Sequence, residues 1–429
     1  MPSYQTYADY RSSGVNSLGP IPSHWKTLAL HYVGRLKSGE SITSLHFIEN
    51  GEYPVYGGNG FRGNYDRFTH DGDHVLIGRQ GALCGNINIA RGRFFASEHA
   101  IVVNPDREFN TNWLGYQLLS MNLNQYSFSA AQPGLSSEVI GRLKIAFPPL
   151  EEQQAIARFL DFKTAQIDTL IAKQQTLLDK LAEKRTALIS HTVTKGLDPS
   201  APMKNSGVTW LGEIPNHWKS KRLKFVIGEP LKYGANEAAE LTDPDLPRYI
   251  RITDVKDDGS LRDETFRSLP QDVANSYLLS DGDILLARSG ATVGKSFIYK
   301  PSWGVAAYAG YLIKARMSDM MEADFAYLFL QSSCYWQWLN SIFIQATIQN
   351  VSAEKYANLI IPVPPVNEQS AIVSDLLTKL EKIDSQRAKV NLVVDRLIEY
   401  RSAVITNTIT GKIDVRGFTV PQPADRMAA

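Results

Sequence analysis

Two long stretches without glycine or proline limit most strongly how this chain can fold. They cover residues 151–192 and 367–408, roughly forty residues each. Glycine and proline are the residues that most disfavour a helix, and helices of globular proteins seldom exceed about 25 residues. Each stretch therefore predicts one unusually long helix, which at about 1.5 Å per residue extends over on the order of 60 Å.

Both stretches belong to an internal duplication. Pro-Pro-Leu-Glu-Glu-Gln at residues 148–153 leads into the first stretch, and Pro-Pro-Val-Asn-Glu-Gln at residues 364–369 leads into the second. Far upstream of each lies an Ile-Pro-x-His-Trp-Lys segment, at residues 21–26 and 214–219. The repeated order predicts a domain at residues 1–147, a spacer helix at 148–195, a second domain at 196–363 with a linker at 196–212, a second spacer helix at 364–411, and a tail at 412–429.

The two domains are predicted to be similar and to mix helices with strands. Short apolar segments separated by glycine and Asp-Gly turn signals indicate strands, and one helix is expected in each domain, at residues 112–123 and 324–339. The fold class is therefore α+β, with two similar domains separated by two long helices in a pseudo-twofold repeat. The expected strands cover residues 53–56, 74–77, 86–89 and 100–103, and in the second domain 248–252, 283–287, 295–299 and 311–313.

Apolar residues recur at spacings of three and four along both stretches, which is typical of a coiled-coil seam. An antiparallel coiled coil within the chain would hold the two domains at its opposite ends. The alternative is that each stretch is an amphipathic core helix of its own domain. The expected seam residues are Leu160, Ile167, Leu170, Leu177, Leu181 and Leu188 in the first stretch, and Leu376, Ile383, Val390, Val393, Leu397, Tyr400 and Val404 in the second.

The composition restricts the classes of protein that need to be considered. A net charge of +1 is far from strongly basic, so groups that contact nucleic acid must cluster in space or come from partner subunits. No apolar run is long enough to span a bilayer, and the first residues lack the pattern of a secretory signal. Cys84 and Cys334 are far apart in sequence, which fits reduced thiols and no metal site. We expect a cytoplasmic protein without a membrane segment.

Several motifs that could indicate catalysis have simpler interpretations. Gly-Asn-Gly-Phe-Arg-Gly at residues 58–63 matches a dinucleotide-binding pattern, but no helical pattern follows it, so a glycine-rich turn or a loop that contacts nucleic acid is favoured. Asp245, Asp254 and Lys256 resemble a loose nuclease pattern that the first half of the chain does not repeat. No motif for adenine methylation, nucleotide hydrolysis, zinc binding or a nucleophile elbow is found. We expect no catalytic residue and no metal site.

Two other repeated segments are interpreted as structural. The Asp-Gly-Asp segments at residues 71–73 and 281–283 precede apolar strands, which is typical of turns. The His-Trp pairs at residues 24–25 and 217–218 are expected to place a buried tryptophan beside a hydrogen-bonded histidine.

Arginines at two equivalent strand ends are the leading candidates for contacts to DNA. Arg79 is followed by Gln-Gly-Ala and Arg288 by Ser-Gly-Ala-Thr. Glycine allows a ligand to approach the backbone, and arginine can donate two parallel hydrogen bonds to phosphate or guanine. A surface ion pair is the alternative for each. The candidate DNA-binding residues are Asn59, Phe61, Arg62, Arg79, Gln80, Arg91, Arg93, Arg248, Arg251, Arg288, Ser289, Thr292, Lys295, Gln345 and Gln349.

These motifs, in their duplicated order, resemble the specificity subunits of type I restriction-modification systems over essentially the whole chain. The resemblance implies that each domain is a target-recognition domain, which reads one part of a split, asymmetric site in double-stranded DNA. It also implies that the two helices pack antiparallel and bind two methyltransferase (modification) subunits, with restriction subunits in the full complex. The chain itself would bind no cofactor, because S-adenosylmethionine, ATP and Mg²⁺ belong to the partner subunits.

Two other functions remain open from the residues alone. A coiled-coil adaptor could use its globular ends to bind other proteins. A single-chain DNA nuclease could use Asp245, Asp254 and Lys256 to hold a metal ion.

Overall fold

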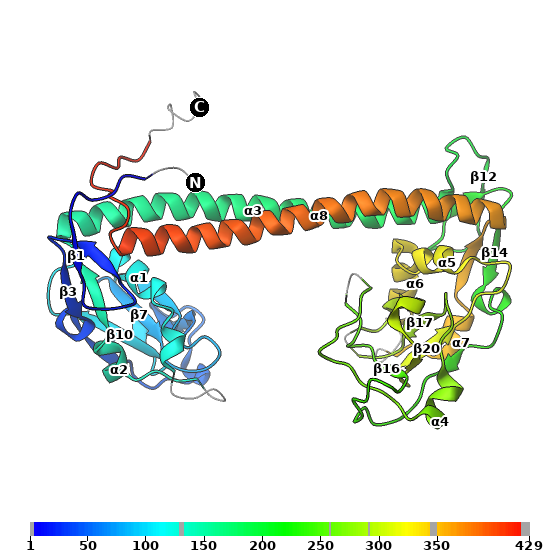
Figure 1. Cartoon of the computed structure of the whole chain (residues 1–429), viewed down its shortest axis with the longest axis horizontal. Coiled ribbons are helices and arrows are strands. Elements are labelled where there is room, and N and C mark those ends of the chain that lie inside the picture. The colour runs from blue at the N-terminus through cyan, green and yellow to red at the C-terminus, as the bar shows by residue number, and fades with distance from the viewer. Residues whose placement is uncertain (1–3, 128–132, 257–258, 291, 344–349, 422–429) are drawn as a thin grey trace. The chain divides into compact units, whose positions relative to one another are not determined.

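The computed structural model describes residues 4–127, 133–256, 259–290, 292–343 and 350–421. The chain forms two compact units, Met1–Gln175 with Asn391–Ala429, and Thr176–Val390. Each unit has one globular α+β domain and parts of the two long helices, α3 (Leu150–Lys195) and α8 (Val366–Ile409), as Figure 1 shows. Among the described residues, no helix combines the length and the apolar character that a membrane crossing requires.

The domain of the first unit is built on an antiparallel sheet in the strand order β4-β10-β7-β8, against which α1 packs. A second sheet has the order β6-β5-β9, and β11 pairs with β3. The strands are β1 (Tyr10–Ser12), β2 (Pro20–Pro22), β3 (Lys26–Ala29), β4 (Gly34–Ser38), β5 (Tyr53–Gly57), β6 (Gly60–Tyr65), β7 (His74–Gly78), β8 (Ile87–Ala90), β9 (Phe95–Ala96), β10 (Ala100–Pro105) and β11 (Lys144–Phe147), and the short helices are α1 (Thr111–Ser120) and α2 (Ser137–Gly141).

Strand β7 is buried on both faces, which explains its continuous apolar sequence. Successive side chains of a strand point to opposite sides of the sheet. Val75 and Ile77 therefore enter the main core, which also contains Trp25 and Trp113. Leu76 points the other way and joins a smaller cluster around Phe94.

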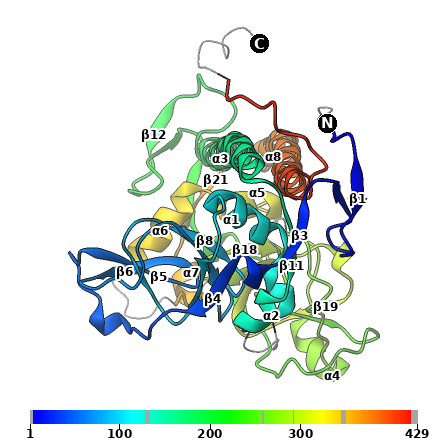
Figure 2. The same ribbon diagram turned by 90° about the vertical axis from the view of Figure 1, so that its left-hand side faces the viewer.

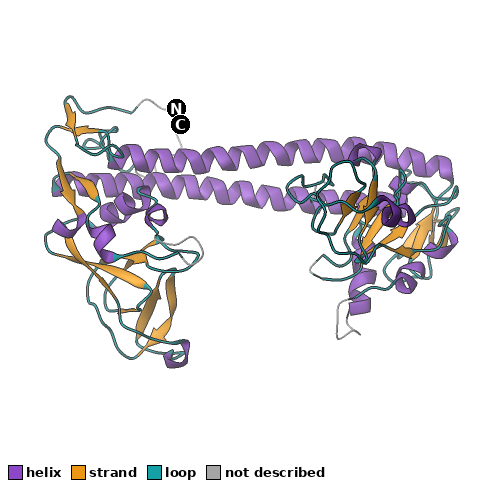
Figure 3. Ribbon diagram, turned by 60° about the horizontal axis from the view of Figure 1, so that its bottom comes forward, coloured by secondary structure: helices purple, strands orange, loops and turns teal. Residues whose placement is uncertain are grey.

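The domain of the second unit repeats this architecture. Its main sheet has the order β15-β20-β17-β18, β16 pairs in parallel with β19 as β5 does with β9, and β14 pairs with β21. Figure 3 shows that the strands of each unit lie in its globular part. The elements are β12 (Met203–Asn205), β13 (Glu213–Pro215), β14 (Lys219–Arg222), β15 (Lys232–Tyr233), β16 (Arg248–Ile250), β17 (Ile284–Ala287), β18 (Ser296–Ile298), β19 (Ala306–Tyr308), β20 (Leu312–Ala315), β21 (Ile360–Val363), α4 (Gln271–Ala274), α5 (Ala323–Phe329), α6 (Ser333–Phe343) and α7 (Ala353–Ala357).

The α+β class and the pseudo-twofold repeat are confirmed, but the single helix expected at residues 324–339 is wrong. The chain forms α5 and α6 instead, with a break at residues 330–332. Ser332 is fully buried, and its Oγ accepts a hydrogen bond from the backbone N–H of Tyr335 at 3.3 Å. The N–H of Ser333 donates to Oγ of Ser190 on α3 at 2.8 Å. These bonds satisfy N–H groups at the start of α6 that have no partner within the helix.

In each unit, α3 and α8 lie side by side and run in opposite directions (Figures 1 and 2). In the first unit, Arg401 of α8 donates two hydrogen bonds to the carboxylate of Asp168 on α3, at 2.8 and 3.2 Å. In the second unit, Arg185 of α3 pairs with Asp384 of α8 at 3.6 Å. The beginning of one helix thus packs beside the end of the other, as the antiparallel arrangement requires.

The expected seam is only partly right. Leu160, Ile167 and Leu181 are buried, whereas Leu170 and Leu177 are exposed. Apolar residues occur here as adjacent pairs, and their spacing alone cannot decide which member of a pair faces the other helix. The more buried members are Ile171 in place of Leu170, Leu178 in place of Leu177, and on α8 Val394 in place of Val393.

Glu152, in the first turn of α3, connects that helix to the N-terminal segment of the chain. One carboxylate oxygen accepts hydrogen bonds from the indole N–H of Trp25 at 3.0 Å and from the hydroxyl of Tyr7 at 2.9 Å. The other lies 2.6 Å from Nε2 of His24. Burial and the nearby carboxylate raise the pKa of Tyr7, so its hydroxyl stays protonated and able to donate.

The second unit repeats this connection with one contact fewer. Glu368 accepts from the indole of Trp218 at 3.0 Å and lies 2.8 Å from Nε2 of His217. The tryptophan of each His-Trp pair is buried, as expected. The shared role explains why the Ile-Pro-x-His-Trp and Pro-Pro-x-x-Glu-Gln segments occur together in both halves of the sequence.

The glutamine that follows each glutamate fixes a second helix of its domain. Gln153 Oε1 accepts from the backbone N–H of Asn110, the N-cap of α1, at 2.9 Å. Gln369 Oε1 does the same for Glu322, the N-cap of α5, at 2.7 Å. Both glutamines are buried. The start of each long helix is therefore held in a fixed position against its domain.

We predict that Glu152→Ala destabilises the first unit by on the order of 2–4 kcal/mol, because it leaves the buried Trp25 indole and the Tyr7 hydroxyl without an acceptor. Urea unfolding followed by tryptophan fluorescence measures the change. Glu151→Ala is the matched control, since Glu151 lies in the same helical turn but is exposed. Equal stability of the two variants would contradict a structural role for the Glu152 carboxylate.

Candidate nucleic-acid interface

A tight loop follows β7 in the first unit and carries Arg79. The backbone N–H of Arg79 donates to the carbonyl of His99 at 2.8 Å, and its own carbonyl accepts from the N–H of Leu135 at 2.9 Å. The loop closes where the N–H of Gly85 donates to the carbonyl of Gly78 at 2.8 Å. Gly81 has a φ of 83°, a conformation that glycine adopts without strain.

The loop after β17 in the second unit has the same backbone hydrogen bonds. The N–H of Arg288 donates to the carbonyl of Tyr311 at 3.1 Å, and its carbonyl accepts from Val351 at 2.9 Å. The N–H of Gly294 closes the loop onto Ala287 at 3.0 Å, and Gly290 has a φ of 80°. The duplication therefore preserves a particular loop geometry as well as the strand order. We call residues 79–86 and 288–294 the strand-end loops.

In the first unit, the turn between β5 and β6 packs against the strand-end loop. A Cβ atom on Gly78 would lie 2.5 Å from the carbonyl oxygen of Gly58, so the two backbones can approach only because residue 78 is glycine. Nδ2 of Asn86 in the loop donates to Oδ1 of Asn59 in the turn at 3.3 Å. The glycine-rich segment at residues 58–63 thus forms the turn of a hairpin and the start of β6. A dinucleotide site would need a helix directly after this segment, and β6 stands there instead.

This contact brings five of the expected residues to one end of the domain. Asn59, Phe61, Arg62 and Gln80 are exposed, and Arg79 is half-buried. Phe61 is 60% exposed, which is unusual for a residue with a large apolar side chain. Aromatic, amide and guanidinium groups side by side can stack on bases and hydrogen-bond to base edges or phosphates.

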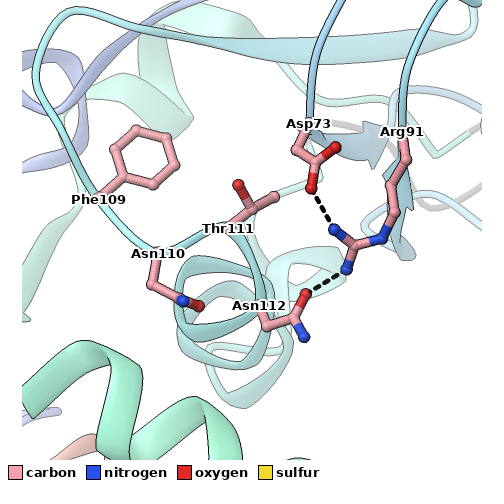
Figure 4. A pocket seen from close by; sticks show the side chains of 6 residues that line it. All are labelled: Asp73, Arg91, Phe109, Asn110, Thr111 and Asn112. Atoms are coloured by element: carbon pink, nitrogen blue, oxygen red, sulfur yellow. Dashed lines mark hydrogen bonds and ion pairs between the residues drawn. The ribbon is translucent and has the colours of Figure 1, made fainter.

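The structure places Arg91 and Arg93 at the other end of β8. Arg91 forms an ion pair with Asp73 and donates to Oδ1 of Asn112 at 2.6 Å. These residues line a pocket of about 260 Å³ at the start of α1 (Figure 4). Arg93 pairs with Asp71 at 3.1 Å. Both charges are thus compensated within the domain, away from the strand-end loop.

Arg248 and Arg251 are also held by contacts within their own domain. Arg251 binds both carboxylate oxygens of Asp254, at 2.8 and 3.1 Å, and the carbonyl of Thr265 at 2.8 Å. Arg248 donates to the carbonyl of Arg262 at 2.7 Å. Asp254 is 1% exposed, so its carboxylate serves this buried pair and is not available as the metal ligand that a nuclease would require. No cluster of metal-binding side chains occurs among the described residues.

The remaining expected residues of the second unit surround its strand-end loop. Ser289 forms a β-bridge with Asn350. The carbonyl of Thr292 accepts from the backbone N–H of Lys295 at 3.0 Å, and the Lys295 side chain is exposed. Gln345 and Gln349 lie outside the described residues.

Two tyrosines beside this loop were not among the expected residues. The Arg288 guanidinium lies 4.7 Å from the centre of the Tyr233 ring. Tyr311, whose carbonyl accepts a hydrogen bond from the Arg288 backbone, is 66% exposed. Tyr311 comes directly before β20 as His99 comes directly before β10. An alignment of the two halves strand by strand would have indicated that position.

Comparison with known proteins identifies the family. Residues 22–179 and 217–393 each match the family described as "Type I restriction modification DNA specificity domain". The EcoprrI specificity subunit of Escherichia coli is 43% identical over 149 residues, which are 34% of this chain and 36% of that protein. The MjaVIII specificity subunit of Methanocaldococcus jannaschii is 22% identical over 93% of this chain and 95% of that protein.

A solved structure has the same fold. A chain from a study of complex assembly and conformational transition of the type I R-M system matches with a TM-score of 0.68 at 15% identity, over 92% of this chain and 99% of that one. The family match covers both halves of the duplicated sequence and includes both strand-end loops. The chain belongs to the family of type I restriction-modification DNA specificity subunits.

Proposed function

We propose that this chain reads a bipartite, asymmetric site in double-stranded DNA, with one strand-end loop on each half-site. The observation that carries the proposal is that the duplicated halves keep the same loop hydrogen bonds and the same arginine at the strand end, Arg79 and Arg288. In the part of the chain that the structure describes, neither guanidinium forms an ion pair. An arginine without an acidic partner is free to bind an anionic or acceptor-rich ligand.

The proposed DNA surface of the first unit consists of Asn59, Phe61, Arg62, Arg79 and Gln80. That of the second unit consists of Arg288, Ser289, Thr292 and Lys295, with Tyr233 and Tyr311 beside them. Arg91, Arg93, Arg248 and Arg251 are left out because aspartates or carbonyl groups of the same domain already bind their guanidinium groups.

The chain itself is proposed to be non-catalytic and to act within a complex. Two methyltransferase subunits, which bind S-adenosylmethionine, would methylate adenine in the DNA that this chain selects. Methylation requires the target base to leave the helix stack. Restriction subunits would add ATP and Mg²⁺-dependent cleavage in the full complex.

The long helices are proposed to bind the methyltransferase subunits. In the first unit, Leu170 of α3 and Leu392, Val393 and Ile398 of α8 are exposed, and in the second unit Leu177 and Leu377 are exposed. A contiguous patch of exposed apolar side chains is typical of a surface for association with other proteins, and we propose that these side chains belong to such patches. Binding of partner subunits would also explain why residues next to the seam are apolar although these residues do not face the other helix.

We predict that Arg79→Ala and Arg288→Ala each weaken DNA binding by the assembled complex about tenfold or more, since each removes a charge-assisted hydrogen bond of about 1.5–3 kcal/mol. Fluorescence anisotropy with a duplex that contains the target site measures the affinity. Arg93→Ala is the control, because it removes the same charge from an exposed ion pair at the other end of β8. Wild-type affinity in both loop variants would contradict the proposed surface.

We predict that one heptad inserted after Gln175 in α3, together with one inserted after Val390 in α8, lengthens the gap between the half-sites by about three base pairs. Seven residues add about 10.5 Å, and B-DNA rises about 3.4 Å per base pair. Both insertions keep the three-four spacing of the seam. Sequencing of methylated bases in cells that express the variant gives the gap directly, and an unchanged gap would rule out the helices as a spacer.

We predict that Leu170→Glu combined with Ile398→Glu reduces co-purification of the methyltransferase subunits, because both changes place a charge on the proposed binding surface. Leu45→Glu is the control, since Leu45 is a fully exposed leucine on the globular domain. Circular dichroism should show unchanged helix content in both proteins. Full recovery of the partner with the helix variant would place the binding surface elsewhere.

A further inference from the structure

The second unit holds its strand-end arginine against an aromatic ring. The Arg288 guanidinium lies 4.7 Å from the centre of the Tyr233 ring. The hydroxyl of Tyr233 accepts a hydrogen bond from the backbone N–H of Ala353 at 3.0 Å, and Tyr233 is paired with Ile313 in the sheet. Both ends of the tyrosine are therefore fixed, and the ring offers a flat support for the guanidinium.

The contacts of Arg288 leave only part of its side chain available. Its Nε is buried and has no hydrogen-bond partner among the described residues, although the residue as a whole is half-buried. The donors that a ligand can reach are therefore those on Nη1 and Nη2. A guanidinium held over a ring presents these N–H groups along one edge, which matches two acceptors that lie in a single plane.

Two kinds of acceptor in DNA can satisfy such an edge, the phosphate oxygens and the O6 and N7 atoms of guanine. A phosphate can be bound by a mobile arginine from many directions, and it gains little from a support that fixes the plane of the guanidinium. Hydrogen bonds to both O6 and N7 of a guanine require the guanidinium to be coplanar with the base. The supporting ring therefore favours guanine.

The first unit lacks this support at the equivalent position. Ile101 pairs with both Ile77 and Ser38, and Ile313 pairs with both Leu286 and Tyr233. Since Arg79 follows Ile77 by two residues and Arg288 follows Leu286 by two, Ser38 occupies the place of Tyr233. The ring is thus a feature of the second domain and not of the shared framework.

We propose that Arg288 reads a guanine in the half-site of the second domain, and that Tyr233 positions its guanidinium for this contact. The inference rests on the proposed function. It adds a base identity to one half-site and assigns Tyr233 as a positioning residue.

Methylation mapping of the complex with its methyltransferase subunits tests the proposal. Arg288→Gln should relax the preference for guanine at one position of one half-site by about tenfold or more, and leave the other half-site unchanged. Tyr233→Ser, which copies the first domain, should relax the same position. Tyr233→Phe, which keeps the ring, should retain the preference for guanine at that position. Methylation that falls equally at all sites, with an unchanged motif, would identify a phosphate contact and overturn the proposal.

A second measurement does not depend on variants that must fold. Binding of the wild-type complex is compared among target duplexes in which each guanine is replaced in turn by 7-deazaguanine, which lacks the N7 acceptor. One such replacement in the half-site of the second domain should weaken binding by the wild-type complex. A second half-site without a sensitive guanine overturns the proposal. A wild-type complex that methylates no bipartite site would instead refute the proposed function.

Discussion

The carboxylates of Glu152, which is buried, and Glu368, which is half-buried, make the contacts on which the arrangement of both halves depends. Each accepts hydrogen bonds from an indole and an imidazole that come from more than a hundred residues earlier in the chain. Removing a carboxylate from water is unfavourable unless hydrogen-bond donors surround it, so each glutamate depends on the His-Trp segment that supplies those donors. Within each unit they fix the start of one long helix against the domain, and thereby fix where the strand-end loop lies relative to that helix.

Much of the fold could be predicted because the sequence is internally duplicated, so that each motif occurs twice in the same order. The order of motifs indicated the two domains and the two long helices, and the apolar segments predicted three of the four strands of each main sheet. The edge strands β4 and β15 were missed. The seam was partly wrong because Leu170 and Ile171, like Leu177 and Leu178, are adjacent apolar residues that equally satisfy a three-four spacing. The break between α5 and α6 could not be seen, because it depends on a contact between Ser333 and Ser190 from distant parts of the chain.

The candidate site was predictable where local sequence determines it. Arg79 and Arg288 follow apolar strands and precede glycines, and both lie in the strand-end loops. Arg91 and Arg251 are also arginines, but each forms an ion pair with an aspartate that only the folded structure reveals. The position of Tyr233 under Arg288 depends on pairing between β15 and β20, which are about eighty residues apart. Sequence spacing carries no signal for such a contact, although the contact between Tyr233 and Arg288 distinguishes the second domain from the first.

Methylation mapping of cells that contain this chain with its methyltransferase subunits, and of the same cells without the chain, tests most directly whether it selects the DNA. We predict methylated adenines at one motif, made of two short half-sites separated by a gap of fixed length and variable sequence, and no methylation of that motif without the chain. Methylation at a single continuous site, or an unchanged pattern without the chain, would contradict the account.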